Sequence, residues 1–355
     1  MDNRINEPII KQPRWKEPLY SKKKIDWAGE IMCSSPNPYD QIEAATKIID
    51  NWRASHAYPL QVLYMKLYRL HGSRKDIIVA QRIKRFSSII YKLSENPGMK
   101  LSRMQDLGGC RMVVPTLEEV SYYSKKLIGS RIRHEFKREY DYITNPKSSG
   151  YRSLHLIYKF KSDTPSKMVY NDMLIELQFR THLQHIWATA LETMQLCTKQ
   201  ALKAGHGSPD YLRFFVLVSS LFAISEDCPV VPGTVADEVE LISEIEGIND
   251  RTHILDTLKG IRMAINHDAV KPNDKRGYYL LTLKYDEQAV IVRYYMPSEA
   301  EQASADYNTI ENSGLGSQED SVLVRASSMA DVRAAYPNYF LDINEFVERV
   351  ESYLQ

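Results

Sequence analysis

Hydrophobic residues at three- and four-residue spacing organise the first half of the chain. Between Tyr39 and Leu70 they include Ile42, Ala45 and Ile48, which predicts a helix. Shorter apolar runs, some of them alternating with polar residues, predict strands. The pattern predicts helices at 39–70, in part of 77–93, and at 117–128, 182–204 and 211–224, with strands at 110–114, 154–160 and 173–179. A helix followed by mixed strands and helices indicates an α/β or α+β fold with a mixed sheet flanked by helices.

Beyond residue 233 the predicted elements become shorter. Residues 278–283 and 289–295 alternate on either side of Asp286-Glu287 and predict a β-hairpin. The other expected elements are helices at 235–245, 253–265 and 343–353 and a strand at 322–326. The polar, Ser/Gly-containing stretch 298–319 predicts a mobile loop. With 228–233 as a linker, the expected organisation is an arm over 1–38, a larger domain over 39–228 and a small α+β domain over 229–355.

Composition narrows the class of protein. A chain of 355 residues with 43% hydrophobic and 26% charged residues is typical of globular proteins. The formal net charge of +1 means that any nucleic-acid contact must come from local basic patches. No apolar stretch approaches the roughly 20 residues that span a membrane. The four cysteines form no CxxC pair, which fits a reducing cytoplasm and argues against a zinc finger.

Two segments in the first domain carry candidate phosphate-binding chemistry. In 82–92, Arg82, Lys84 and Lys92 could place cations on a polyphosphate, and a solvated helix face is the alternative. In Asp106-Leu-Gly-Gly-Cys-Arg111, a carboxylate enters a buried strand five residues before an arginine. That spacing suits a magnesium ligand beside a phosphate clamp, and an aspartate that only caps a turn is about as common.

Two further segments carry candidate acceptor-binding chemistry. Pro146-Lys-x-x-Gly150-Tyr151 offers a lysine, a flexible turn and an aromatic ring on which a base can stack. In the predicted strand at 173–179 and the residues that follow it, Glu176, Gln178 and Arg180 share one face while Leu177 and Phe179 point into the core. Three polar groups of different chemistry on one face favour an active site over a solvated edge.

These segments, in this order, resemble the synthetase domain of the RelA/SpoT homologue superfamily over roughly residues 75–225. The elements G-Y-x-S-L-H, from Gly150, and E-x-Q-x-R-T, from Glu176, carry most of the resemblance, and His185, Trp187 and Glu192 continue it. The resemblance implies a nucleotidyltransferase-like fold. It also implies an ATP-dependent pyrophosphokinase that moves the β,γ-pyrophosphate of ATP onto a ribose 3′-hydroxyl with Mg²⁺.

The resemblance also assigns expected roles, position by position. ATP contacts are expected from Arg82, Lys84, Ser88, Lys92 and Arg111, with Asp106 as the Mg²⁺ ligand. Glu176 is expected to deprotonate the 3′-hydroxyl and to help bind the metal. The acceptor pocket is expected to contain Lys147, Tyr151, His155, Gln178 and Arg180. At position 152 many long members of the superfamily carry Gln, whereas this chain carries Arg. Arg152 is expected to add a phosphate contact.

Two acceptors are compatible with this chemistry. One is a free guanosine nucleotide, which would make the chain an alarmone synthetase. The other is the 3′ CCA end of tRNA, which would make it a toxin that blocks translation. Local basic residues favour the RNA, and they include Lys22, Lys23, Lys24, Arg131, Arg133, Lys137, Arg138, Lys147 and Arg152. The tRNA acceptor is therefore the first expectation.

The C-terminal domain shapes the expected regulation. A synthetase followed by a short cysteine-free domain with a Tyr336-x-x-Tyr339 element resembles the fused toxin–antitoxin synthetases of the CapRel type. That resemblance implies a domain like a zinc finger without zinc, whose tyrosines block the ATP site until a phage capsid protein binds. Core packing is the alternative for both tyrosines. A monomeric enzyme is expected, and a non-catalytic sensor of phage protein is the competing function.

Overall fold

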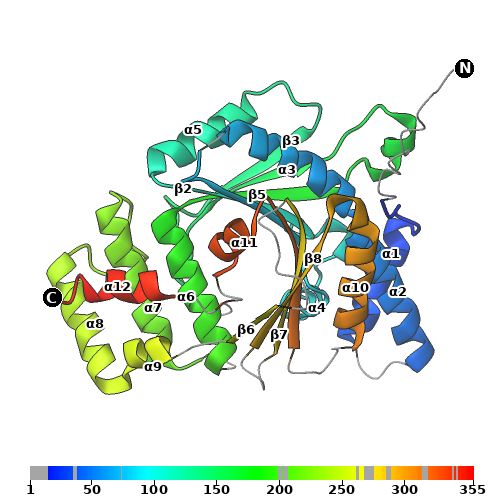
Figure 1. Ribbon diagram of the computed structural model, residues 1–355. Coiled ribbons are helices and arrows are strands. Elements are labelled where there is room, and N and C mark those ends of the chain that lie inside the picture. Colours follow the sequence, from blue (N-terminus) through cyan, green and yellow to red (C-terminus); the bar gives the residue numbers. More distant parts are fainter. Residues whose placement is uncertain are drawn as a thin grey trace, which may run out of the picture.

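The protein is built on one mixed β-sheet with helices on both faces (Figure 1). The computed structural model describes residues 15–34, 38–72, 74–198, 202, 207–260, 264–267, 276–284, 289–313, 319–337, 340 and 343–355. The described residues form nine strands in the order β3-β4-β5-β2-β1-β9-β7-β8-β6, where β2/β5 and β6/β8 run parallel and the other neighbouring pairs antiparallel. The expected mixed sheet flanked by helices is confirmed.

Strands from the first part of the chain form one side of this sheet. Their bounds are β1 Ile78–Ile83, β2 Gly108–Val114, β3 Glu135–Asp141, β4 Leu154–Lys159 and β5 Leu174–Thr181. The expected helix within 77–93 is wrong at its start, because β1 pairs with both β2 and β9 there and only Phe86–Glu95 is helical (α4). The apolar pattern of the sequence did not predict β3, because it is an exposed, charge-rich edge strand.

Helices cover both faces of these strands. Their bounds are α1 Lys22–Cys33, α2 Tyr39–Ser55, α3 Ala57–His71, α5 Leu117–Ile128, α6 His182–Thr198 and α7 Pro209–Ser225. The predicted helix over 39–70 is two helices, because the chain changes direction around His56. The side chains of α3 and α5 pack on one face of β2, β4 and β5. On the opposite face these strands carry the polar residues of E-x-Q-x-R.

Strands from the C-terminal part extend the same sheet. Their bounds are β6 Ala264–His267, β7 Gly277–Lys284, β8 Ala289–Tyr295 and β9 Glu319–Ala326. The predicted hairpin is confirmed by the antiparallel pairing of β7 with β8. The two parts of the sheet join where Gln81 and Arg82 of β1 pair with Arg325 and Val324 of β9.

Two helices that the sequence analysis did not predict cover opposite faces of β7 and β9. Helix α10, Ala300–Ser313, lies where a mobile loop was expected, and that expectation is wrong. Ala300, Ala303 and Tyr307 recur along it and pack on Tyr278 and Leu280. Helix α11, Met329–Ala335, packs on the other face and lies beside α6 near the middle of the molecule (Figure 1). Regular helices thus seal both faces of this half of the sheet.

The remaining C-terminal helices pack away from the sheet. Helices α8 Glu238–Thr252, α9 Ile254–Gly260 and α12 Asn344–Glu351 share one apolar core with α6 and α7. Phe346 of α12 stacks on Phe215 of α7, with ring centroids 5.8 Å apart. The residues after 229 therefore contact the first part of the chain through the sheet and also through this helical core. No helix among the described residues is long and apolar enough to cross a membrane.

Candidate active site

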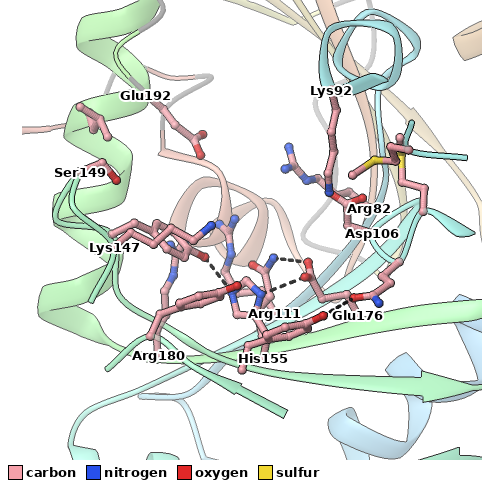
Figure 2. A pocket seen from close by; sticks show the side chains of 18 of the residues that line it. Arg82, Lys92, Asp106, Arg111, Lys147, Ser149, His155, Glu176, Arg180 and Glu192 are labelled. Atoms are coloured by element: carbon pink, nitrogen blue, oxygen red, sulfur yellow. Dashed lines mark hydrogen bonds and ion pairs between the residues drawn. The ribbon is translucent and has the colours of Figure 1, made fainter. Parts of the chain in front are cut away.

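A cavity of about 490 Å³ lies on the face of the sheet opposite α3 and α5, beside α6 (Figure 2). A second space of about 40 Å³ adjoins it and is bounded by Tyr336. Most of the predicted site residues come together here. The larger cavity is lined by Arg82, Lys92, Asp106, Arg111, Lys147, Tyr151, His155, Glu176, Gln178 and Arg180, and the smaller one adds Lys84.

Strand register explains how residues distant in the sequence meet. Along the parallel β2/β5 pair, Gly109 lies opposite Glu176 and Arg111 opposite Gln178. On the other side of β5, His155 of β4 lies opposite Gln178. Because side chains alternate between faces along a strand, this register directs Arg111, His155, Glu176 and Gln178 to the same face. The same alternation sends Leu177 and Phe179 into the core beneath.

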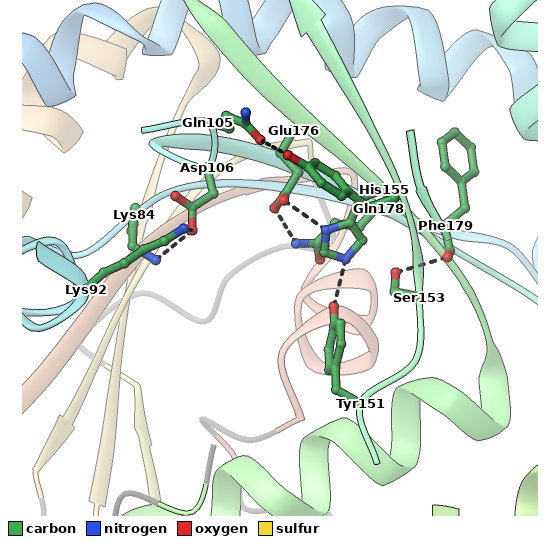
Figure 3. Close-up of polar contacts among 11 residues, drawn as sticks. Lys84, Lys92, Gln105, Asp106, Tyr151, Ser153, His155, Glu176, Gln178 and Phe179 are labelled. Carbon is green, nitrogen blue, oxygen red and sulfur yellow. Dashed lines mark hydrogen bonds and ion pairs between the residues drawn. The ribbon is translucent and has the colours of Figure 1, made fainter. Parts of the chain in front are cut away.

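Asp106 holds two lysines at one side of the cleft (Figure 3). Its Oδ2 lies 2.8 Å from Lys84 Nζ and 3.0 Å from Lys92 Nζ. Burial by itself raises the pKa of Asp106, but the charges of Lys84 and Lys92 outweigh it and hold the pKa well below its usual range. Asp106 is therefore ionised at neutral pH, and two ammonium groups are fixed beside it.

Glu176 stands at the end of a chain of hydrogen bonds (Figure 3). His155 Nδ1 is 2.9 Å from Glu176 Oε1, and Gln178 Nε2 donates to Oε2 at 2.6 Å. Burial favours a raised pKa for Glu176, but the hydrogen bonds from His155 and Gln178 lower it overall. An ionised Glu176 accepts from His155 Nδ1–H. In the neutral ring, Nε2 then accepts from the hydroxyl of Tyr151 at 3.0 Å. The arrangement presents the ionised carboxylate of Glu176 to the cleft and fixes it with hydrogen bonds from His155 and Gln178.

The two carboxylates fit a divalent cation. Asp106 Oδ1 is buried and has no hydrogen-bond partner among the described residues. It shares both cavities with Glu176, whose oxygens keep spare lone pairs after accepting one hydrogen bond each. The described residues contain no cluster of three or more His, Cys, Asp or Glu side chains that could hold a metal by itself. Such a pair suits Mg²⁺, which usually takes one or two carboxylates together with water and phosphate oxygens.

Arginines and one histidine form the other side of the cleft. Arg111 Nη1 donates to the carbonyl of Ala335 at 3.0 Å, and its guanidinium lies 5.7 Å from the centroid of the Tyr336 ring. Tyr336 is 3% exposed. The cation–π partner of Tyr336 is Arg111 of β2, and Tyr336 shares the smaller space with Arg82 of β1. Tyr339 lies outside the described residues.

His185 has contacts that its sequence position did not reveal. Its Nδ1 lies 2.5 Å from Arg180 Nη2, and its Nε2 lies 2.7 Å from the carbonyl of Ala334. His185 follows Arg180 by five residues, at the start of α6, so it was visible as part of the motif. Its contact with α11 joins positions 149 residues apart and could not be read from local spacing.

Aromatic residues surround the expected acceptor loop. Lys147 Nζ lies 4.5 Å from the ring centroid of Tyr142 and 5.4 Å from that of Tyr151. Tyr140 stacks on Tyr142 with an interplanar angle of 3°, and both line the cleft. Neither tyrosine was predicted from the sequence, because β3 was not predicted. Tyr140 of β3 and Tyr142, just after it, are two residues apart, and this spacing is the signal that places side chains of an extended segment on one face.

Other predicted residues lie away from the cleft lining. Ser88 is in the first turn of α4, and Lys22, Lys23 and Lys24 begin α1. Arg131 and Arg133 are exposed in the segment before β3, and Arg133 pairs with Asp163 at 3.1 Å.

The expectation for Arg152 is wrong. Its side chain is 3% exposed and donates to Ser219 Oγ and to the carbonyls of Ile143 and Pro229, at 2.7–3.1 Å. These contacts tie the acceptor loop to α7 and to the segment that follows α7. Arg152 is therefore a structural arginine and offers no phosphate contact.

Comparison with known proteins agrees with this geometry. Residues 81–197 match the family model described as a region found in RelA / SpoT proteins. Bacillus subtilis GTP pyrophosphokinase YjbM is 31% identical over 126 residues, and YwaC from the same organism is 27% identical over 126 residues. These alignments cover 35% and 34% of this chain, and the chain spans 58% of the length of each relative.

Solved structures of small alarmone synthetases show a limited likeness. Small alarmone synthetase 1 from Bacillus subtilis, bound to its product pppGpp, aligns with a TM-score of 0.41 at 23% identity, over 58% of this chain and 100% of that chain. Small alarmone synthetase 2 from Bacillus subtilis aligns with a TM-score of 0.42 at 20% identity, over 50% of this chain and 93% of that chain. The family match supports the resemblance of residues 81–197 to RelA / SpoT proteins. The likeness to the CapRel type stays a prediction.

Proposed function

We propose that this chain, through the RelA/SpoT region at residues 81–197, is a pyrophosphokinase that transfers the β,γ-pyrophosphate of ATP to a ribose 3′-hydroxyl. The observation that carries the proposal is the pairing of two separate acidic centres in one cleft. Asp106 lies among lysines suited to a polyphosphate, and Glu176 is held by His155 and Gln178. Transfer of a phosphoryl-type group needs charge neutralisation, in-line positioning and a base at the nucleophile.

The proposed reaction divides these roles between the two sides of the cleft. Lys84, Lys92 and Arg111 would bind the triphosphate, and Glu176 would accept the proton of the 3′-hydroxyl. The 3′-oxygen forms a bond to the β-phosphorus, the bond from that phosphorus to the α,β-bridging oxygen breaks, and AMP leaves. Mg²⁺ held by Asp106 and Glu176 would neutralise charge on the phosphate oxygens. Tyr151, beside Lys147, would stack on the acceptor base.

The acceptor that we propose is a free guanosine nucleotide such as GDP or GTP. Three curated relatives, including the one from Haemophilus influenzae, are named GTP pyrophosphokinases. The Lys147–Tyr151 arrangement offers one cation and one ring, which is enough for a single base and its phosphates.

A tRNA 3′ end is the second candidate acceptor. It is favoured by the exposed basic residues Lys137 and Arg138 of β3, the strand that also carries Tyr140 to the cleft. Ion pairing of Lys137 with Glu135 and of Arg133 with Asp163 weakens this basic surface.

We further propose that α11 and Tyr336 hold the enzyme in an inactive state. Tyr336 bounds the smaller space together with Arg82, Asp106 and Glu176, where the reacting phosphates would lie. A protein that binds the open form preferentially would activate the enzyme by population shift. A phage capsid protein as that partner, a monomeric state and a cytoplasmic location stay predictions from the sequence.

The test is to incubate the chain with ATP labelled in the γ-phosphate and with GDP, GTP or tRNA in separate reactions. The proposal predicts label in the nucleotide acceptor and one AMP released for each transfer. Labelling of tRNA alone would support the second candidate. Release of ADP in place of AMP would show a simple kinase and overturn the proposal, as would the absence of transfer in both the wild-type chain and the Tyr336→Ala variant.

A further inference from the structure

The contact between Arg180 and His185 fixes which nitrogen of the histidine carries a proton. A guanidinium has donors and no acceptor, so His185 Nδ1, 2.5 Å from Arg180 Nη2, must be unprotonated. The proton of the neutral ring is then on Nε2. Burial and the charges of Arg180 and Arg111 lower the pKa of His185 well below its usual value, in agreement with a neutral ring. His185 therefore presents one N–H donor of fixed direction.

That donor and Arg111 both bind the C-terminal end of α11. His185 Nε2 lies 2.7 Å from the carbonyl of Ala334, and Arg111 Nη1 lies 3.0 Å from the carbonyl of Ala335. The last carbonyls of a helix lack partners within the helix and carry partial negative charge. Two neighbouring peptide oxygens with partial negative charge thus accept the hydrogen bonds of His185 and Arg111 at the side of the cleft.

A second observation indicates that peptide oxygens do not fully satisfy this group. Arg180 is 2% exposed, and its Nε is buried without a hydrogen-bond partner among the described residues, as is the Nε of Arg111. Burial lowers the pKa of Arg180 most, and repulsion by the like charge of Arg111 lowers it further. Glu192, on α6, is a nearby carboxylate that acts in the opposite direction. Buried, clustered cations with unused donors favour an anion with several oxygens.

We propose that His185 is a further binding residue of this cleft. It donates Nε2–H to a phosphate oxygen of a nucleotide polyphosphate once α11 has moved away, and so completes an anion subsite with Arg111 and Arg180. The carbonyls of Ala334 and Ala335 hold the places of two phosphate oxygens in the structure described here. The subsite rests on the proposed function for its ligand, a nucleotide polyphosphate. Its binding can be measured without any transfer reaction.

Two conservative variants test whether His185 donates a hydrogen bond to the ligand or only positions Arg180. The amide nitrogen of glutamine can replace Nε2–H, so His185→Gln keeps the donor. The amide of asparagine can reach only the place of Nδ1, so His185→Asn keeps the contact with Arg180 and loses the donor. Both variants are made in the full chain, alone and with Tyr336→Ala, which weakens the hold of α11. A thermal melt of each variant checks that it is folded.

The measurement is calorimetric binding of inorganic pyrophosphate. We expect Tyr336→Ala to bind it about two- to thirtyfold more tightly than the wild-type chain, because a lost cation–π contact weakens the competition from the carbonyls of α11. In that background His185→Gln should stay within about threefold, and His185→Asn should lose about tenfold or more, as expected for a hydrogen bond to a charged group. Competition with the ATP analogue AMPCPP or with GDP then shows whether the donor or the acceptor nucleotide supplies the phosphates.

Several outcomes would overturn the subsite. One is that Tyr336→Ala does not bind pyrophosphate more tightly than the wild-type chain. Another is that His185→Asn binds it as tightly as its parent does. The third is that neither AMPCPP nor GDP displaces bound pyrophosphate. Transfer activity with any of these results would leave the proposed function standing and remove the subsite. If pyrophosphate binds as expected but no transfer occurs, the subsite stands and the proposed function is removed.

Discussion

Strands β5 and β7 belong to one sheet and have opposite characters. Along β5 the side chains alternate, so that Glu176 and Gln178 face the cleft while Leu177 and Phe179 are buried. Along β7 the residues from Gly277 to Leu283 are all buried, because α10 covers one face and α11 the other. A sheet face that borders a cleft can carry charged groups, whereas a sheet with both faces packed under helices buries apolar side chains on each face.

The two halves of the sheet have different roles. One carries the polar groups of the cleft, and the other holds α11 in place. Polar groups that would react or bind gather over β2, β4 and β5, where a cavity of about 490 Å³ remains. Apolar residues over β7 and β9 seat α11, whose last residues reach across to Arg111 and His185. Mutations should therefore affect activity in the first half and stability or regulation in the second.

The largest effect is expected on the polar strand. Replacing Glu176 with Gln should lower pyrophosphate transfer about 10²–10⁴-fold, the usual cost of losing a general base. The amide keeps the size of the side chain, so the melting temperature should change little. Transfer of labelled pyrophosphate and binding of AMPCPP would be measured side by side. Glu139→Gln, on the exposed edge strand β3, is the matched control, and near-normal transfer by Glu176→Gln would remove the assignment of Glu176 as the base.

Core truncation on the apolar strand should lower stability. Leu281 is fully buried beneath α11, and Leu281→Ala should reduce the free energy of unfolding by about 2–5 kcal/mol. Gln178→Ala on β5 removes one hydrogen bond to the ionised Glu176, which should cost about 1.5–3 kcal/mol at most, and it should impair transfer. Denaturant unfolding of both variants tests the contrast. Equal losses of stability at the two positions would contradict the division between chemistry and anchoring.

Removal of the ring that links the two halves should raise activity. A cation–π contact stabilises by about 0.5–2 kcal/mol, so Tyr336→Ala should raise basal transfer by up to about 30-fold and make expression toxic. Tyr339→Ala is expected to act in the same direction. Growth arrest and melting temperature would be measured with and without Glu176→Gln. A large fall in melting temperature with lower activity would instead identify Tyr336 as an ordinary core residue.

The smallest effect is expected from pH. The pKa of Asp106 is lower in the folded protein than in the unfolded chain, where it is about 3.9. Its ionised form therefore stabilises the fold above about pH 4, and this contribution is lost as pH falls through the lower, folded pKa. Asp106→Asn should be less stable than the wild-type chain at pH 7, and the difference should shrink below pH 4. Asp163→Asn, which removes an exposed pair with Arg133, is the control and should show little pH-dependent difference.

Local sequence determined the chemistry of the cleft. The spacing of Glu176, Gln178 and Arg180 placed three polar groups on one face of a strand, because side chains alternate along extended backbone. The motifs around Asp106 and Tyr151 likewise identified residues that line the same cavity. The strong apolar periodicity of α5, α6 and α7 predicted those helices for the same reason, since each needs only its own residues to show a buried face.

Tertiary structure decided the features that depend on distant partners. Helix α10 forms where polar sequence predicted a loop, because Ala300, Ala303 and Tyr307 find an apolar surface on β7. Arg152 became structural because its donors meet two backbone carbonyls and Ser219 in the core. The pairing of β1 with β9 and the contacts of α11 with Arg111 and His185 join residues more than 140 positions apart. Hydrogen-bond donors and apolar surfaces specify what kind of partner they need, and only the folded chain determines which segment supplies it.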